Sequence, residues 1–294
     1  MPYLAEAAIS AAQSWPAIDF MRRAYESNGE PLRLLESGQR WFARVLSHER
    51  DGTQSDTALV LGATPWLAGL IRGTAALTTV ADTSTAMLNL CAESVRMSAN
   101  GACRGRIDFL HRNWLALPPN VQGLDVVAGD NAFSFLQYPD EWDRLLELLA
   151  DRMTAGAVLL SRLLAIPGEH RRLDAAEIIR ATLARRAPVN FTALRVALLF
   201  AHWDSAEYTI RPEDALDTFQ EHRAEFDPLL CDVANATEND LLSIEKYRGT
   251  GVTYFVPPLA DAIAVFERHF RVSAVYFGPY EMSQYFPLIA AARR

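Results

Sequence analysis

The segment Leu59-Val60-Leu61-Gly62-Ala63-Thr64-Pro65-Trp66-Leu67 sets the architecture of the chain. A short apolar run of strand length, starting at Thr57, ends at Gly62, and a helix is expected from Pro65. Gly62 has no side chain, which lets the backbone approach a ligand closely. Thr64 is placed to cap the helix, and Pro65 takes the first helical position, where a missing N–H does no harm. The free amides at the start of this helix are therefore expected to face a ligand site.

Asp82 lies 20 residues after Gly62, at the end of a second apolar run over residues 77–81. In a Rossmann-like sheet this spacing places a carboxylate beside the first loop, where it accepts hydrogen bonds from ribose hydroxyls. A carboxylate that closes a buried strand needs partners, so a purely structural role explains Asp82 poorly. Gly62 and Asp82 together predict an adenosine site at the carboxyl edge of the sheet.

The order of elements around these residues predicts the fold class. Strands are expected at residues 57–61, 77–81, 107–111, 124–128 and 157–165, with helices from residue 65, from about residue 85 and over residues 141–153. Near-continuous apolar strands alternating with helices are typical of a mostly parallel sheet with helices on both faces. A helix at 259–269 and strands at 271–277 and 288–293 follow later. The linker 278–287 is too short for a crossover helix, so the last strand is expected to be antiparallel.

We therefore predict an α/β, Rossmann-like fold with three parts along the chain. Residues 1–52 form an N-terminal helical cap, and residues 53–165 and 251–294 form the Rossmann-like domain. Residues 166–250 break the alternation, with helices expected at 173–186, at 191–203 and around 213–246. This stretch is interpreted as an inserted helical lid over the substrate.

The composition and net charge of the chain limit the kinds of binding partner that we expect. The 294 residues are 50% hydrophobic and carry a net charge of −8, so a sizeable core is available and no basic surplus exists to bind nucleic acid. The adjacent Arg185 and Arg186 are typical of a solvated helix face. Three widely spaced cysteines, Cys91, Cys103 and Cys231, favour a reducing compartment over disulfides or a metal site. With no signal segment and no long apolar span, we expect a cytoplasmic protein that does not act at a membrane.

The residues of the first loop favour a cofactor without a diphosphate over NAD. An NAD fingerprint needs three glycines so that the backbone can hold a diphosphate. Thr64, Pro65 and later bulky residues occupy the second and third glycine positions here. S-adenosylmethionine (SAM) has no diphosphate, so it tolerates that crowding better. The expected terminal strand hairpin also favours SAM, since doubly wound NAD domains do not usually end in one.

These residues resemble the class I SAM-dependent methyltransferases, and most closely the bacterial small-molecule members whose first loop reads Gly-Ala-Thr-Pro. The resemblance covers residues 55–165 and 250–294, with the residues after Tyr280 similar to the family's final strand pair. It implies SAM as cofactor, S-adenosylhomocysteine (SAH) as product and a small-molecule metabolite as methyl acceptor. A secondary-metabolism setting follows from the analogy alone.

The resemblance also implies a set of cofactor contacts. The backbone of the first loop would hold the methionine part, Asp82 the ribose, and the next residues the adenine. Asn113-Trp114 stands where relatives have an Asp-Trp pair beside the adenine, and the Asn amide can both accept and donate there. The loop after the fourth strand would lie under the sulfonium and the substrate. The residues so assigned are Gly62, Ala63, Thr64, Asp82, Thr83, Met87, Asn113, Trp114, Gly129, Asp130 and Asn131.

Some of these residues also have simpler structural explanations. Trp114 can be a core residue, and Asp130 can cap a helix. Met87 shares an apolar helix stripe with Cys91 and Val95, and such stripes are usually core.

Methyl transfer from a sulfonium is a direct displacement, so alignment matters more than a catalytic dyad. A base is needed only where the acceptor must lose a proton, and the candidates are His170, His202, Tyr247 and Tyr254. His202 and Tyr254 are taken as the catalytic candidates, although a lone histidine at a helix end is more often structural. His111, within a strand, is interpreted as structural. No metal is expected.

The lid is rich in apolar and aromatic residues, which favours helix–helix packing first and a partly aromatic or apolar substrate second. The residues concerned are Phe191, Leu194, Phe200, Trp203 and Tyr254. Two other functions stay open: a fold relative that binds SAM or SAH without transferring methyl, and an NAD-type oxidoreductase. A homodimer is also left open.

Overall fold

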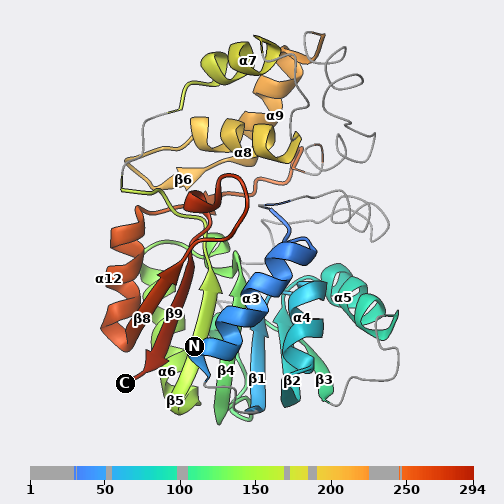
Figure 1. Cartoon of the computed structure of the whole chain (residues 1–294), viewed down its shortest axis with the longest axis vertical. Helices are drawn as coiled ribbons and strands as arrows, with labels where there is room; N and C mark the ends of the chain where they lie inside the picture. The colour runs from blue at the N-terminus through green and yellow to red at the C-terminus, as the bar shows by residue number, and fades with distance from the viewer. Residues whose placement is uncertain are drawn as a thin grey trace, which may run out of the picture. The chain divides into compact units, whose positions relative to one another are not determined.

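The computed structural model describes residues 30, 32–50, 55–97, 105–168, 173–184, 191–224, 245 and 247–294. The chain divides into two compact units (Figure 1). The sheet unit comprises Leu34–Gly168 and Phe255–Arg294, and the helical unit comprises Met1–Arg33 and Glu169–Tyr254. The division into cap, SAM-binding domain and lid remains a prediction about function. Residues 36–49, assigned above to the cap, lie in the sheet unit.

The sheet unit is built on a seven-stranded sheet in the order β3-β2-β1-β4-β5-β9-β8. The strands are β1 (Ser55–Leu61), β2 (Ala75–Asp82), β3 (Arg106–His111), β4 (Leu124–Asp130), β5 (Met153–Arg162), β8 (Phe270–Tyr276) and β9 (Leu288–Arg293). Strands β1 to β5 are mutually parallel, whereas β9 runs antiparallel to both β5 and β8. The Rossmann-like fold class, with its antiparallel last strand, is confirmed.

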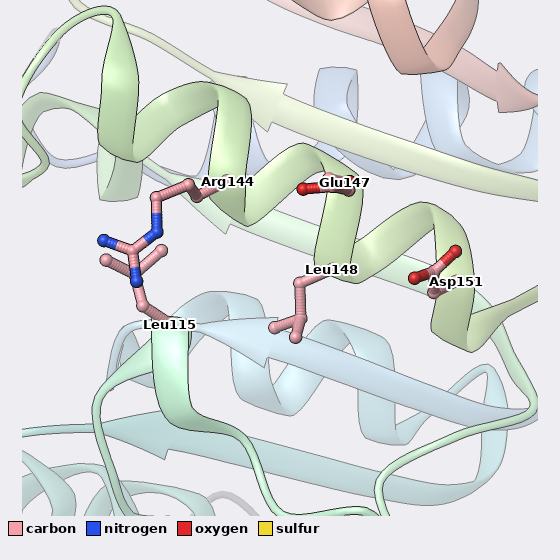
Figure 2. A pocket seen from close by; sticks show the side chains of 5 residues that line it. All are labelled: Leu115, Arg144, Glu147, Leu148 and Asp151. Carbon is pink, nitrogen blue, oxygen red and sulfur yellow. The ribbon is translucent and has the colours of Figure 1, made fainter. Parts of the chain in front are cut away.

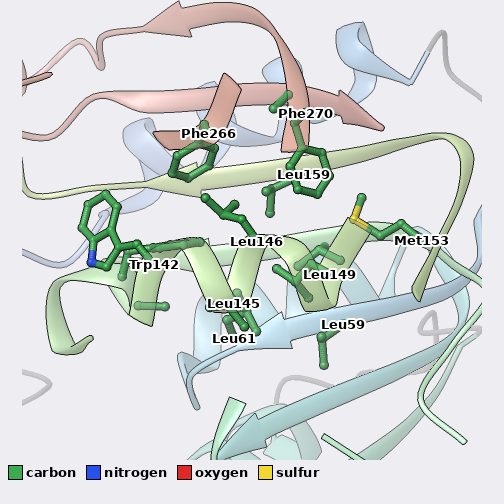
Figure 3. Close-up of a cluster of buried hydrophobic side chains, with 14 of the residues drawn as sticks. Leu59, Leu61, Trp142, Leu145, Leu146, Leu149, Met153, Leu159, Phe266 and Phe270 are labelled. Atoms are coloured by element: carbon green, nitrogen blue, oxygen red, sulfur yellow. The ribbon is translucent and has the colours of Figure 1, made fainter. Parts of the chain in front are cut away.

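Helices cover both faces of the sheet, because neighbouring strand residues point to opposite sides. Helices α3 (Glu36–Glu49), α4 (Pro65–Arg72) and α5 (Thr85–Met97) pack with Ala58 and Val60 of β1 on one face. Helices α6 (Asp140–Arg152) and α12 (Leu259–His269) cover Leu59 and Leu61 on the other (Figure 3). The continuous apolar runs seen in the sequence follow from this two-sided burial.

Helix α6 packs against the core through the apolar residues that recur along its sequence. Its buried residues, Trp142, Leu145, Leu146 and Leu149, recur at helical spacing and face the core. Trp142 is fully buried, and its indole nitrogen donates to the carbonyl oxygen of Leu136 at 3.1 Å. Burial of one such side chain stabilises the fold by about 1.5–3 kcal/mol.

The connection from β3 to β4 contains only a short 3-10 turn, η1 (Trp114–Ala116), among its described residues. The guanidinium of Arg152, in the last turn of α6, holds the segment that follows. It donates to the carbonyl oxygens of Leu117, Pro118 and Val121 at 2.9, 2.6 and 2.7 Å. Arg152 therefore fixes a stretch of irregular backbone next to the sheet.

Two predictions about the sheet were wrong. Strand β5 spans Met153–Arg162 rather than residues 157–165, although the residues that follow Arg162 are equally buried. The amides of Leu163 and Ala165 instead donate to the carbonyl oxygens of Pro287 and Tyr285. The segment from Tyr280 onward is also not a strand pair: it holds a 3-10 turn, η3 (Ser283–Tyr285), and then β9.

The helical unit contains α7 (Ala175–Ala184), α8 (Phe191–Ala201), α9 (Pro212–Glu221) and strand β6 (Thr209–Ile210), which pairs with β7 (Tyr254–Phe255). Nine residues of α8 are buried, so it is a core helix of this unit. Of the helix expected around 213–246, the described part is α9. The predictions for Cys103, His170, Arg185, Arg186 and Cys231 lie outside the described residues. Within the described ranges, no helix is long and apolar enough to cross a membrane.

Candidate functional site

The first loop leaves β1 through a backbone conformation that favours glycine. Gly62 has φ +88°, and its amide donates to the carbonyl oxygen of Ala81 at the end of β2. Helix α4 begins at Pro65, as predicted. Thr64 is the N-cap residue, as predicted, and has an extended conformation, but its side chain makes no capping hydrogen bond.

The carboxylate of Asp82 lies against this loop. Its Oδ2 accepts the amide of Ala63 and its Oδ1 accepts the amide of Ser84, each at 2.7 Å. Burial raises the pKa of Asp82, opposed by these amides, by the amide of Thr83 and by the nearby His111. A carboxylate offers about four lone-pair positions, so with three backbone amides against it Asp82 can still accept a further donor.

Trp114 lies beside the same loop. Its indole nitrogen donates to the carbonyl oxygen of Ala81 at 2.7 Å. A Cβ built on Gly62 would lie 3.7 Å from Cζ2 of Trp114, which is ordinary contact. The ring is half-buried and also packs against the core on the α6 side. Trp114 is therefore part of the core and a neighbour of the first loop at once.

Asn113 performs a local task that the sequence did not reveal. Its side-chain oxygen accepts the amide of Leu115 at 2.9 Å and so caps η1. The second lone pair of that oxygen and the amide nitrogen are the groups that an adenine could still engage.

The residues that follow Asp82 make local hydrogen bonds and core contacts. The carbonyl oxygen of Thr83 accepts a hydrogen bond from Nε2 of His111 at 2.8 Å. Met87 is half-buried and packs against the cluster that includes Cys91. The hydroxyl of Ser84 accepts the amide of Met87 at 3.2 Å, a helix-start contact that the sequence analysis missed.

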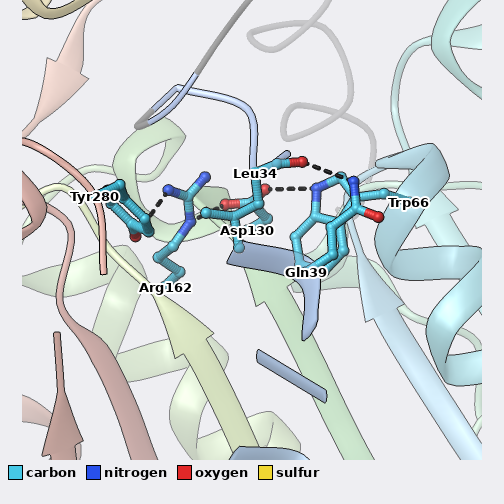
Figure 4. A network of polar contacts seen from close by, with 6 residues as sticks. All are labelled: Leu34, Gln39, Trp66, Asp130, Arg162 and Tyr280. Carbon is cyan, nitrogen blue, oxygen red and sulfur yellow. Dashed lines mark hydrogen bonds and ion pairs between the residues drawn. The ribbon is translucent and has the colours of Figure 1, made fainter. Parts of the chain in front are cut away.

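The corner after β4 is held by a buried ion pair (Figure 4). Oδ1 of Asp130 accepts Nε of Arg162 at 2.6 Å, and the two side chains are 5% and 0% exposed. Oδ2 of Asp130 accepts the indole nitrogen of Trp66 at 3.2 Å. Burial lowers the pKa of Arg162, but the charge of Asp130 and contacts with Tyr280 outweigh it and leave that pKa raised. Asp130 therefore caps no helix: its charge is balanced by Arg162.

The residues on either side of Asp130 differ in how far the backbone restricts them. A Cβ built on Gly129 would lie 3.4 Å from Cβ of Ala132 and 3.5 Å from Oγ of Ser161, which is ordinary contact. Asn131 adopts a left-handed conformation with φ +58°, which asparagine tolerates better than most residues. Its Oδ1 is buried and has no hydrogen-bond partner among the described residues.

The two catalytic candidates lie in the helical unit. Nε2 of His202 is 2.9 Å from the hydroxyl of Thr218, so this histidine links α8 to α9. The hydroxyl of Tyr254 is 2.6 Å from that of Tyr247 in a buried pair. Burial and Tyr247 raise the pKa of Tyr254 well above its usual value of 10, which disfavours the phenolate that a base would require.

A shallow cavity of about 230 Å³ lies between α6 and η1 (Figure 2). It is lined by Leu115, Arg144, Glu147, Leu148 and Asp151. None of these residues belongs to the predicted cofactor contacts.

No family model matches the sequence, and no curated protein matches it either. Among solved structures, a Rhodobacter sphaeroides protein described as a Zn-dependent alcohol dehydrogenase is 18% identical, with a TM-score of 0.52 over 94% of this chain and 98% of that chain. The PH0226 protein from Pyrococcus horikoshii is 10% identical, with a TM-score of 0.50 over 90% and 94%. The N-methyltransferase NodS from Bradyrhizobium japonicum, solved with SAH, is 8% identical, with a TM-score of 0.49 over 94% and 96%. At these identities the first two likenesses support the fold alone.

Proposed function

We propose that the protein is a SAM-dependent methyltransferase that acts on a small-molecule metabolite. The observation that carries the proposal is the position of β9, which lies antiparallel between β5 and β8. The sequence resembles the class I methyltransferases, and a final antiparallel strand is a feature of the sheet in that family. An NAD-binding doubly wound domain does not usually end in such a reversal.

The carboxyl edge of the sheet fits an adenosine with an amino-acid tail. Asp82 would accept a ribose hydroxyl with the lone-pair capacity that the amides of Ala63, Thr83 and Ser84 leave free. The ring of Trp114 borders the first loop, where an adenine face would pack. The start of α4 offers free amides for the carboxylate of the tail.

The same edge suits a diphosphate poorly. The first loop has one glycine, Gly62, and continues into Thr64, Pro65 and Trp66. These bulky residues stand where a diphosphate-binding turn needs glycines, so the backbone cannot approach a diphosphate closely. We therefore place the NAD-type oxidoreductase third, after a fold relative that binds SAM or SAH without transferring methyl.

In the proposed reaction, SAM supplies a methyl group bound to a positively charged sulfur. The residues of this chain would bind the adenosine, orient the tail and exclude water. Alignment of the acceptor with the S–CH3 bond is worth on the order of 7–11 kcal/mol, so no catalytic dyad is required. His202 remains the candidate base from the helical unit. Tyr254, hydrogen-bonded to Tyr247, is a weaker candidate because its pKa is raised.

Calorimetric titration with SAM, SAH and NAD tests this proposal. We expect SAM and SAH to bind and NAD not to bind. Asp82→Ala should weaken SAH binding by about 1–3 kcal/mol, because the ribose hydroxyls lose their acceptor. Asp108→Ala is the matched control, since Asp108 is a half-exposed residue of β3 paired to an exposed arginine.

Binding of NAD without SAM would reject the methyltransferase proposal. An unchanged SAH affinity in Asp82→Ala would show that the ribose lies elsewhere. Tight SAM binding without transfer of labelled methyl to a broad metabolite panel would favour a relative that binds the cofactor and transfers nothing.

A further inference from the structure

We propose that Asp130 is a positioning residue rather than a ligand of the cofactor or the substrate. With Trp66, Arg162 and Tyr280 it forms what we call the carboxyl-edge network (Figure 4). This network would hold the start of α4 against the corner that follows β4. The inference rests on the proposed function and refines its site.

The contacts of Asp130 are already made within the protein. One carboxylate oxygen accepts Nε of Arg162 at 2.6 Å and the other accepts the indole nitrogen of Trp66 at 3.2 Å. The Asp130 side chain is only 5% exposed. A ligand would therefore reach almost none of this carboxylate. A ligand that took the place of either donor would leave Arg162 or Trp66 without its acceptor, Asp130.

Arg162 fixes the corner from two directions. Its side chain holds Asp130, and its backbone carbonyl oxygen accepts the amide of Asn131 at 2.8 Å. Asn131 is thereby kept at φ +58°, with its Oδ1 buried and lacking a hydrogen-bond partner in the described part of the chain. Asn131 as a whole is half-buried, so it is the more accessible residue at this corner, and we place the action of Asp130 on the site through its backbone.

Trp66 connects the corner to the first loop. It follows Pro65 in the first turn of α4, whose amides face the proposed site for the amino-acid tail. At the other end, Nη1 of Arg162 lies 3.4 Å from the hydroxyl of Tyr280, in the connection between β8 and β9. The network therefore joins segments that are distant in sequence but meet at one edge of the sheet.

Because Trp66 and Asp130 belong to one network, we expect the effects of their substitutions on SAH affinity to be coupled. Loss of the hydrogen bond at Trp66 or at Asp130 would release the start of α4 from the corner in the same way. The second loss would then add little to the first, because residues that act through one network are not additive.

The test is a double-substitution cycle read by SAH calorimetry. We expect Trp66→Phe and Asp130→Asn each to weaken SAH binding about 3- to 10-fold, the value of one hydrogen bond. We expect the double variant to be no weaker than the worse single variant. Asp143→Asn is the matched control for Asp130→Asn: Asp143 lies on α6, pairs with Arg268 and His269 outside the network, and its replacement should leave SAH affinity unchanged.

Three results would overturn the inference. A large loss in Asp130→Asn with none in Trp66→Phe would make Asp130 a direct ligand. Additive losses would mean that the two residues act separately. Lowered thermal stability with unchanged SAH affinity in both variants would mean a purely structural network. Failure of the unsubstituted protein to bind SAH would instead reject the proposed function before any variant is compared.

Asp130→Asn leaves the buried guanidinium of Arg162 without its counter-charge, which is a severe change. If that variant does not fold, the cycle is run with Trp66→Phe and Tyr280→Phe, which removes the hydroxyl at the far end of the network. The same lack of additivity is expected, and additive or absent effects on SAH affinity would again overturn the inference.

Discussion

The indole nitrogen of Trp114 donates to the carbonyl oxygen of Ala81 at 2.7 Å, one residue before Asp82. The amide of Gly62 donates to the same oxygen at 2.9 Å. One carbonyl thus aligns the end of β2, the first loop and an aromatic ring. The adenine pocket that we propose depends on this shared acceptor.

Trp114→Phe keeps an aromatic ring and removes its donor. We expect a loss of about 0.5–1.5 kcal/mol in the free energy of unfolding, the net value of one hydrogen bond, and a small loss of SAH affinity. Trp114→Ala should weaken SAH binding further, because the ring itself is lost. Urea unfolding and calorimetry measure the two effects. Equal SAH affinities in the Phe and Ala variants would show that the ring does not contact the adenine.

The affinity for SAH should depend on pH through Asp82. Burial raises the pKa of this carboxyl above its usual value of 3.8, and ribose donors would favour the charged form and lower that pKa. Affinity should therefore be highest above the raised pKa. It should decrease as the pH falls through it, by up to about tenfold per pH unit. Asp82→Asn should bind weakly with no such dependence, and a pH profile that survives this substitution would assign the titration to another group.

Arg152 should matter more to stability than a neighbour on the same helix. Arg152→Met removes the donors that hold the carbonyls of Leu117, Pro118 and Val121, and we expect a loss of about 2–4 kcal/mol in unfolding free energy. Arg144→Met on the exposed side of α6 should stay within about 0.5 kcal/mol of the unsubstituted protein. If Arg152→Met changed the unfolding free energy as little as Arg144→Met, water would be replacing the Arg152 hydrogen bonds without cost.

The hydroxyls of Tyr247 and Tyr254 should be energetically coupled. Replacing either tyrosine by phenylalanine removes a buried hydrogen-bond partner of the other, at a cost of about 1–3 kcal/mol. The double variant should lose less than the sum of the two. Urea unfolding of the four proteins gives the coupling. Additive losses would show that the two hydroxyls do not depend on each other.

Much of the fold could be predicted because strand ends carry their own signals. Apolar runs that stop at Gly62, at Asp82 and at Asp130 predicted three parallel strands, and the ten-residue linker before β9 predicted its reversal. The end of β5 could not be predicted, because residues 163–166 are as buried as the strand itself and only their hydrogen bonds differ.

The position of Asp82 could be predicted, because a carboxylate that ends a buried strand needs hydrogen-bond partners. Asp82 is where a carboxylate at the end of β2 was expected, with partners in the first loop. The pairing of Asp130 with Arg162 was missed, since these residues are 32 positions apart and meet only through the β4–β5 register. The signal was a charged residue at the end of each of two neighbouring buried strands. Which side chain would balance Asp130 depended on geometry that the sequence alone does not supply.

The placement of β9 has a consequence for how the chain assembles. Residues 288–293 form the last strand of this sheet in chain order, yet among the described strands β8 joins the sheet through them. Until they are available, β5 presents an unpaired edge and β8 has no sheet to join. Such edges invite pairing with other chains. During translation, closure of the sheet must therefore wait for the final strand, and removal of that strand would detach β8 as well.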